Sequence, residues 1–154
     1  ELGRDYLPYA CRLGVNFLDK HNEKGFFFLV EGGQVDWSGH YNKPDMLAAE
    51  MADINRSILE ALQFALMDGT TLVIVTADHA TGGLSLPASE KNPERIERRY
   101  TTNGHNPALV PVFAFGPRAE LFSGIYDNTQ LHDKILQALE WETQEERISL
   151  QAAE

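Results

Sequence analysis

Apolar residues recur at three- and four-residue steps in three stretches of the chain, which is the spacing of an amphipathic helix. These stretches cover residues 5–21, 44–68 and 129–142. Pro44 suits a first helical turn, and Gly69 is placed where helices commonly stop. The pattern therefore predicts three helices.

Three other stretches are short, continuous and apolar, which is the pattern of strands buried on both faces of a sheet. They are FFFLV at residues 26–30, residues 71–76, and ALVPVFAFGP at 108–117, where Pro111 favours a place nearer the sheet edge. The irregular residues 84–104 predict an excursion over the surface. The order helix, strand, helix, strand, excursion, strand, helix predicts an α/β fold with a mostly parallel sheet and flanking helices.

Composition and charge narrow the class of protein. The 154 residues, 43% hydrophobic and 23% charged, suit one globular domain or a piece of a larger one. No apolar run reaches the length of a membrane span, and the N-terminus lacks the pattern of a signal peptide. A net charge of −10 argues against nucleic acid or an anionic membrane as a partner. The single Cys11 leaves the redox compartment undecided.

Acidic and histidine side chains gather where the predicted strands end, which is where open α/β sheets bind ligands. These residues lie in glycine-containing loops, and they are Glu31, Asp36, His40, Asp78, His79 and His105. Asp oxygens and His nitrogens suit Zn²⁺, and Glu oxygens suit Mg²⁺, so the pattern predicts a cation site. His21 and His132 lie in or beside predicted helices, and we interpret them as surface or packing residues.

Three motifs together carry a family resemblance. VEGGQVDWSGH, TLVIVTADHATGG and GHNPALVPVFAFGP…GIYDNT resemble the alkaline phosphatases over roughly residues 25–140, and look most like the bacterial, marine-type branch. The resemblance implies three metal positions: a first zinc at Asp36, His40 and His105, a second zinc at Asp78 and His79, and a magnesium at Glu31. Trp37 differs from the residues found in other branches, and we expect it to form a wall of the pocket.

The resemblance also implies an activity, the hydrolysis of phosphate monoesters. The family uses a serine nucleophile in an Asp-Ser-Ala segment and an arginine that clamps the phosphate, but no Asp-Ser dipeptide occurs in this chain. We therefore expect residues 1–154 to be the C-terminal part of an alkaline phosphatase catalytic domain, inactive alone, with a frayed tail at 143–154. The full enzyme is expected to be a periplasmic or secreted homodimer.

Three alternatives stay open from the sequence. A sulfatase or phosphodiesterase of the same superfamily would share the metal-site architecture but use another nucleophile or one metal fewer. A non-catalytic metal-binding module would keep the ligands without the reaction. A plain structural α/β domain would bind no metal.

Overall fold

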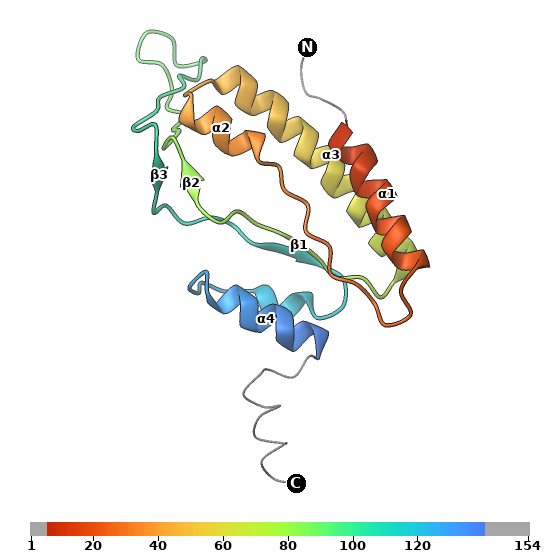
Figure 1. Ribbon diagram of the computed structural model, residues 1–154. Coiled ribbons are helices and arrows are strands. Elements are labelled where there is room, and N and C mark those ends of the chain that lie inside the picture. The colour runs from red at the N-terminus through yellow and green to blue at the C-terminus, as the bar shows by residue number, and fades with distance from the viewer. Residues whose placement is uncertain (1–5, 141–154) are drawn as a thin grey trace.

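The computed structural model describes residues 6–140, so the tail at 143–154 lies outside the described part (Figure 1). The helices are α1 (Tyr6–Lys20), α2 (Gln34–His40), α3 (Pro44–Asp68), the 3-10 helix η1 (Ala119–Phe122) and α4 (Gln130–Leu139). The strands are β1 (Val73–Val75), β2 (Ala80–Thr81), β3 (His105–Asn106) and β4 (Phe113–Phe115). This arrangement confirms the α/β class.

The three predicted helices are confirmed as α1, α3 and α4. Helices α1 and α3 lie side by side. Their buried apolar side chains are Cys11 and Val15 on α1 and Ala65 on α3. The Cys11 thiol donates to the backbone carbonyl of Ser57, 3.5 Å away, and so links α1 to α3. Helix α3 ends at Gly69, whose φ of +74° is a left-handed conformation that favours glycine. None of the described helices is long and apolar enough to cross a membrane.

Helix α2 was not expected from the sequence. Residues 34–40 are too few to show helical periodicity, and Gly39 together with the polar side chains suggested a loop. The helix packs against α3, and it places Asp36 and His40 four residues apart, on the same side of one helical turn.

The strands form two antiparallel pairs among the described residues. Val73 pairs with Phe115 in the β1–β4 ladder, and Thr81 pairs with His105 in the β2–β3 ladder. The parallel pairing that we predicted was therefore wrong for β1 and β4, while β2 and β3 were not predicted as strands. Apolar composition identifies a strand but does not report the direction of its partner. Here the chain turns back after 84–104 and returns along β1 (Figure 1).

The segment FFFLV, residues 26–30, is extended but joins no ladder in the described part of the chain, so the predicted buried strand was also wrong. Alternate side chains of the segment contact the helices. The Phe26 ring lies 6.3 Å from that of Phe64, and Phe28 covers Gly14, where an added Cβ would lie 2.6 Å from Phe28 Cζ. The intervening Phe27 and Leu29 are 58% and 77% exposed. The segment thus has one packed side and one open side.

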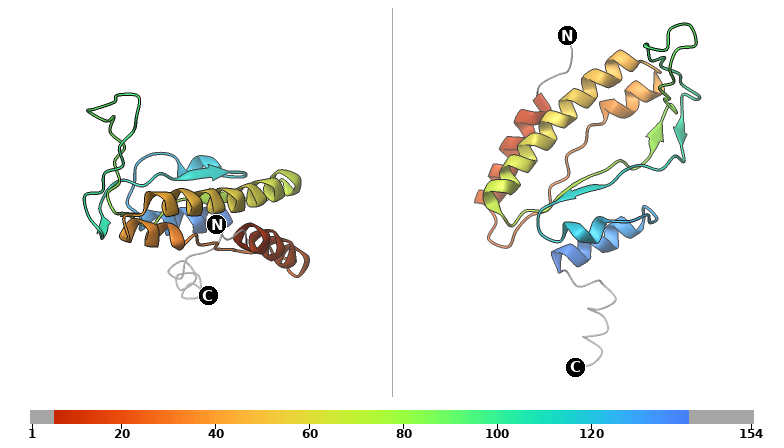
Figure 2. Two further views of the ribbon diagram at one scale, coloured as in Figure 1. Left: turned by 90° about the horizontal axis from the view of Figure 1, so that it is seen from above. Right: turned by 180° about the vertical axis from the view of Figure 1, so that it is seen from behind.

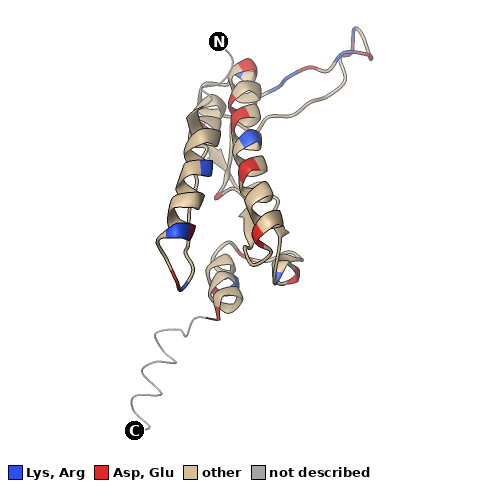
Figure 3. Cartoon of the chain, turned by 90° about the vertical axis from the view of Figure 1, so that its right-hand side faces the viewer, with Lys and Arg blue, Asp and Glu red and all other residues tan. Residues whose placement is uncertain are grey.

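Residues 84–104 project from the body as a hairpin-like excursion (Figure 2). Two isolated bridges hold its arms together, Ser85 to Arg99 and Ala88 to Ile96. Arg98 Nη1 donates to Asp45 Oδ1 at 2.6 Å and so ties the base of the excursion to the start of α3. Charged residues of both signs occur along the excursion and α3 (Figure 3).

Candidate metal centre

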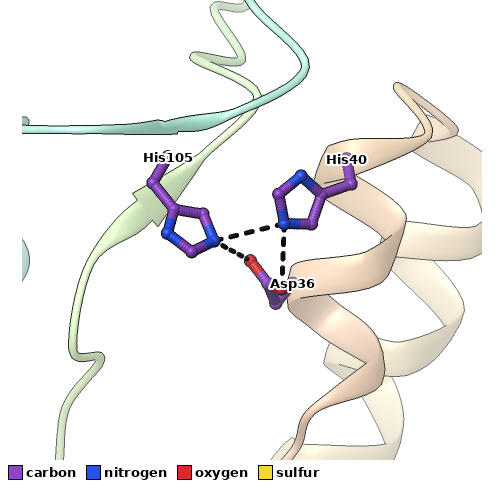
Figure 4. Close-up of side chains that lie close together, drawn as sticks. All are labelled: Asp36, His40 and His105. Atoms are coloured by element: carbon purple, nitrogen blue, oxygen red, sulfur yellow. Dashed lines mark hydrogen bonds and ion pairs between the residues drawn. The ribbon is translucent and has the colours of Figure 1, made fainter.

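Three segments that are far apart in the sequence meet at one end of the fold. Helix α2 lies directly against β2, since a Cβ added at Gly39 would lie 3.0 Å from Thr81 Cβ. The β2–β3 ladder then places His105 opposite Thr81. His105 is thereby brought to the side chains of Asp36 and His40 on α2 (Figure 4).

The ligand-type atoms of Asp36, His40 and His105 converge within 4.8 Å of one another. His40 Nε2 lies 3.3 Å from Asp36 Oδ2 and 3.1 Å from His105 Nε2. His105 Nε2 lies 3.5 Å from Asp36 Oδ1. The side chains of Asp36, His40 and His105 are 34%, 28% and 51% exposed, so the cluster is open to a ligand from solvent.

Hydrogen bonding determines which nitrogen of His40 faces the cluster. Nδ1 lies 2.6 Å from the backbone carbonyl of Asn103, which can only accept, so Nδ1–H donates to it. In the neutral ring, Nε2 then presents a lone pair to Asp36 Oδ2, which is also an acceptor. Two acceptors at this distance repel unless a proton or a metal cation lies between them. One carboxylate and two imidazoles are a donor set that fits Zn²⁺ with a further position open.

The surroundings keep Asp36 anionic. Partial burial raises its pKa, but the hydrogen bond from Thr81 and the electrostatic effects of His40, His105 and His79 outweigh burial. The net pKa lies below the ordinary value for an aspartate. The carboxylate is therefore available to a cation at neutral pH.

The predicted second-zinc residues lie beside this cluster. His79 Nε2 is 3.3 Å from Asp78 Oδ2. The His79 ring stacks on that of His105 with centroids 3.5 Å apart and planes 23° apart. The Asp78 side chain is 87% exposed, and no third ligand-type group joins this pair among the described residues.

The predicted magnesium residue, Glu31, is not a member of the three-residue cluster. It lines a hollow of about 20 Å³, together with Asp53 and Glu50 on α3. This space is large enough for one small ion or water. The Asp53 carboxylate is paired with Arg56 at 2.8 Å.

The two histidines that we interpreted as surface or packing residues are outside the cluster. His21 Nδ1 contacts the Phe17 carbonyl at the end of α1, and His132 contacts Asp133 on α4. Trp37 is half exposed, and its ring centroid lies 5.7 Å from that of His40, beside the cluster.

Two contributors were missed from the sequence. Asn103 acts through its backbone carbonyl, and no side-chain pattern reports such a role. Thr81 Oγ1 donates to Asp36 Oδ1 at 2.6 Å and lies 3.2 Å from His79 Nδ1. The signal for Thr81 was its position two residues after His79 in the glycine-rich motif.

Comparison with known proteins gives consistent matches. The profile of the alkaline phosphatase family matches residues 10–96. Alkaline phosphatase 4 of Bacillus subtilis is 47% identical, with 86% of this chain and 44% of that protein aligned. Alkaline phosphatase of Escherichia coli K12 is 33% identical, with 82% and 31% aligned.

Solved structures of alkaline phosphatases also match this chain. The alkaline phosphatase of the Antarctic bacterium TAB5 superposes with a TM-score of 0.85 at 42% identity, covering 90% of this chain and 42% of that chain. A variant of that enzyme holds Mg in its M3 site. The chain spans less than half the length of these relatives. The family profile covers more than half of the chain, and the chain belongs to the alkaline phosphatase family.

Proposed function

We propose that this chain contributes the metal-ligand portion of a metal-dependent hydrolase of phosphate monoesters. The observation that carries the proposal is the convergence of Asp36, His40 and His105 within 4.8 Å, in a chain of the alkaline phosphatase family. We assign a first zinc to these three residues. We further propose a second zinc at Asp78 and His79 and a magnesium at Glu31.

The residues of this chain hold and orient the cations. Asp36 stays anionic, and the carbonyl of Asn103 keeps the Nε2 lone pair of His40 directed into the cluster. When bound, divalent cations act as Lewis acids toward phosphoryl oxygens. They also invert the local field, which lets a chain of net charge −10 attract a dianionic ester.

The nucleophile has to come from outside these 154 residues, because the Asp-Ser segment of the family does not occur in them. The relatives contain more than half of their length beyond the aligned part. We propose that this remainder of the family fold supplies the serine and the phosphate-binding arginine. From the family alone, we also propose a homodimeric enzyme of the periplasm or exterior.

The test is a phosphomonoester assay with zinc and magnesium on the purified chain, alone and mixed with the remaining portion of a close relative. We expect turnover only in the mixture, lost in His105→Ala and kept in the matched control His132→Ala. Turnover by the chain alone on the order of 1–10³ s⁻¹ would contradict the proposal. A preference for sulfate esters or phosphodiesters would instead favour a related enzyme of the superfamily.

A further inference from the structure

Thr81 lies between the two groups of candidate ligands. Its hydroxyl oxygen is 2.6 Å from Asp36 Oδ1 and 3.2 Å from His79 Nδ1. Asp36 belongs to the three-residue cluster, and His79 to the neighbouring pair. One hydroxyl therefore touches a member of each.

The number of available protons determines which group donates in the contacts of Thr81 with Asp36 and His79. A threonine hydroxyl has one hydrogen, and an ionised carboxylate can only accept, so the shorter contact uses that hydrogen for Asp36. The hydroxyl can then only accept from His79, and a hydrogen bond between the two requires the proton on Nδ1 of that ring. In the neutral ring, Nε2 is left with its lone pair, and it faces Asp78 Oδ2 at 3.3 Å. A hydrogen bond at one ring nitrogen commonly fixes the nitrogen that binds a metal.

The backbone around Thr81 holds the hydroxyl in place. A Cβ on Gly39 would lie 3.0 Å from Thr81 Cβ, so α2 and β2 are already in close contact there. At Gly82, φ is +80° and an added Cβ would lie 2.9 Å from the Gly39 carbonyl oxygen, so this turn requires glycine. The β-branched side chain of threonine is also restricted at χ1.

We propose that Thr81 is a positioning residue for both metal positions at once. Its hydroxyl orients the Asp36 carboxylate and selects the His79 tautomer that directs Nε2 toward Asp78. This inference rests on the proposed function, because it assumes that the two groups hold metals.

The experiment compares the unmodified chain with Thr81→Val, which removes the hydroxyl at nearly constant shape, and Thr81→Ser, which keeps it. Thr101→Val is the matched control, since the Thr101 hydroxyl contacts the Gly83 carbonyl. Zinc titration measures affinity, and nitrogen NMR of the metal-free chain measures the His79 tautomer, with His79→Ala for assignment. Circular dichroism checks that each variant is folded.

In Thr81→Val we expect zinc affinity to fall about 10–100-fold, as is typical when a group behind a ligand is removed. The His79 signal should lose its Nδ1–H preference. Thr81→Ser should restore both values, and Thr101→Val should leave both unchanged. Unchanged zinc affinity or an unchanged tautomer in folded Thr81→Val would overturn the inference, as would failure of serine to restore them. If the unmodified chain binds no zinc, the proposed function fails, while the tautomer measurement still decides whether the hydroxyl orients His79.

Discussion

At the scale of single residues, the histidines of this chain differ in what holds their second ring nitrogen. His40 is fixed by the carbonyl of Asn103 at 2.6 Å, so its Nε2 faces Asp36 and His105. His132 is exposed on α4 and contacts only its neighbour Asp133 in the described structure. Residue type alone does not make a ligand, because the ring must also be oriented toward other donors.

Zinc titration should separate these histidines. His40→Ala or His105→Ala removes one of three convergent donors and should lower zinc affinity at least tenfold, about 1.4 kcal/mol. His132→Ala should leave the affinity unchanged. Isothermal titration calorimetry on the three variants is the measurement, and the assignment of the first zinc is wrong if all three behave alike.

Acid should release the metal through the imidazoles before it reaches the carboxylate. A ligating imidazole must be neutral, and free imidazole is protonated below about pH 6.5, so affinity should fall as pH drops through that range. The pKa of Asp36 is lowered, so its carboxylate stays available for zinc binding above the ordinary aspartate pKa. That contribution to zinc affinity is lost only at pH values below the ordinary pKa. Zinc titrations from about pH 5 to 8 test this expectation, and a flat profile would rule out histidine ligation.

Sequence reasoning singled out Asp36, His40 and His105 because carboxylate and imidazole side chains in glycine-containing loops are uncommon in combination. It missed Thr81, since threonine is frequent in strands and turns for other reasons. It could not find the carbonyl of Asn103, because every residue has one. Ligand types could be predicted, but the groups that orient them could not.

At the scale of elements, the long helices followed from periodicity, whereas α2 and the strand directions did not. Seven residues give too short a pattern to recognise a helix, and the apolar run at 26–30 does not show which segment would pair with it. The strands β2 and β3 have only two residues each, and pairing rather than composition defines them. These short elements are the ones that position the candidate centre.

The contact between α2 and β2 leads to a prediction about Gly39. In Gly39→Ala the new methyl group would lie 3.0 Å from Thr81 Cβ and Cγ2 and 3.1 Å from its carbonyl, so β2 must shift. Overpacking of this kind typically costs about 1–3 kcal/mol, and the shift should also weaken zinc binding by moving Thr81 and His105.

The matched control is Gly104→Ala, because the nearest atom to a Cβ there is Thr102 Oγ1 at an ordinary 3.7 Å. Urea denaturation and zinc titration of both variants give the comparison. Equal stability and equal zinc affinity for the two would show that the approach of α2 to β2 does not hold the centre together.

At the scale of the whole molecule, the described structure leaves apolar side chains exposed on several segments, among them residues 26–30 and β4. Phe27 and Leu29 are exposed on the extended segment at 26–30. Phe113 and Phe115, two residues apart on β4 and so on one face, are 64% and 42% exposed. The TAB5 enzyme, which superposes on this chain, has more than half of its length outside the superposed part. We infer that these surfaces are where the remainder of the family fold packs.

That inference predicts how the chain behaves alone. Exposed apolar faces and unpaired strand edges favour association, so the purified chain should run larger than a monomer at micromolar concentration. Leu29→Lys combined with Phe113→Lys places charge on both surfaces and should shift the chain toward monomer. Leu86→Lys is the control, because Leu86 is also exposed, at 58%, but lies on the excursion. Sedimentation velocity measures the size of all three proteins. The remaining portion of a close relative, when added, should suppress self-association of the unmodified chain. The same portion should not bind the double variant. A chain that is monomeric without any partner, or a double variant that associates as strongly as the Leu86→Lys control, would show that neither surface is an interface.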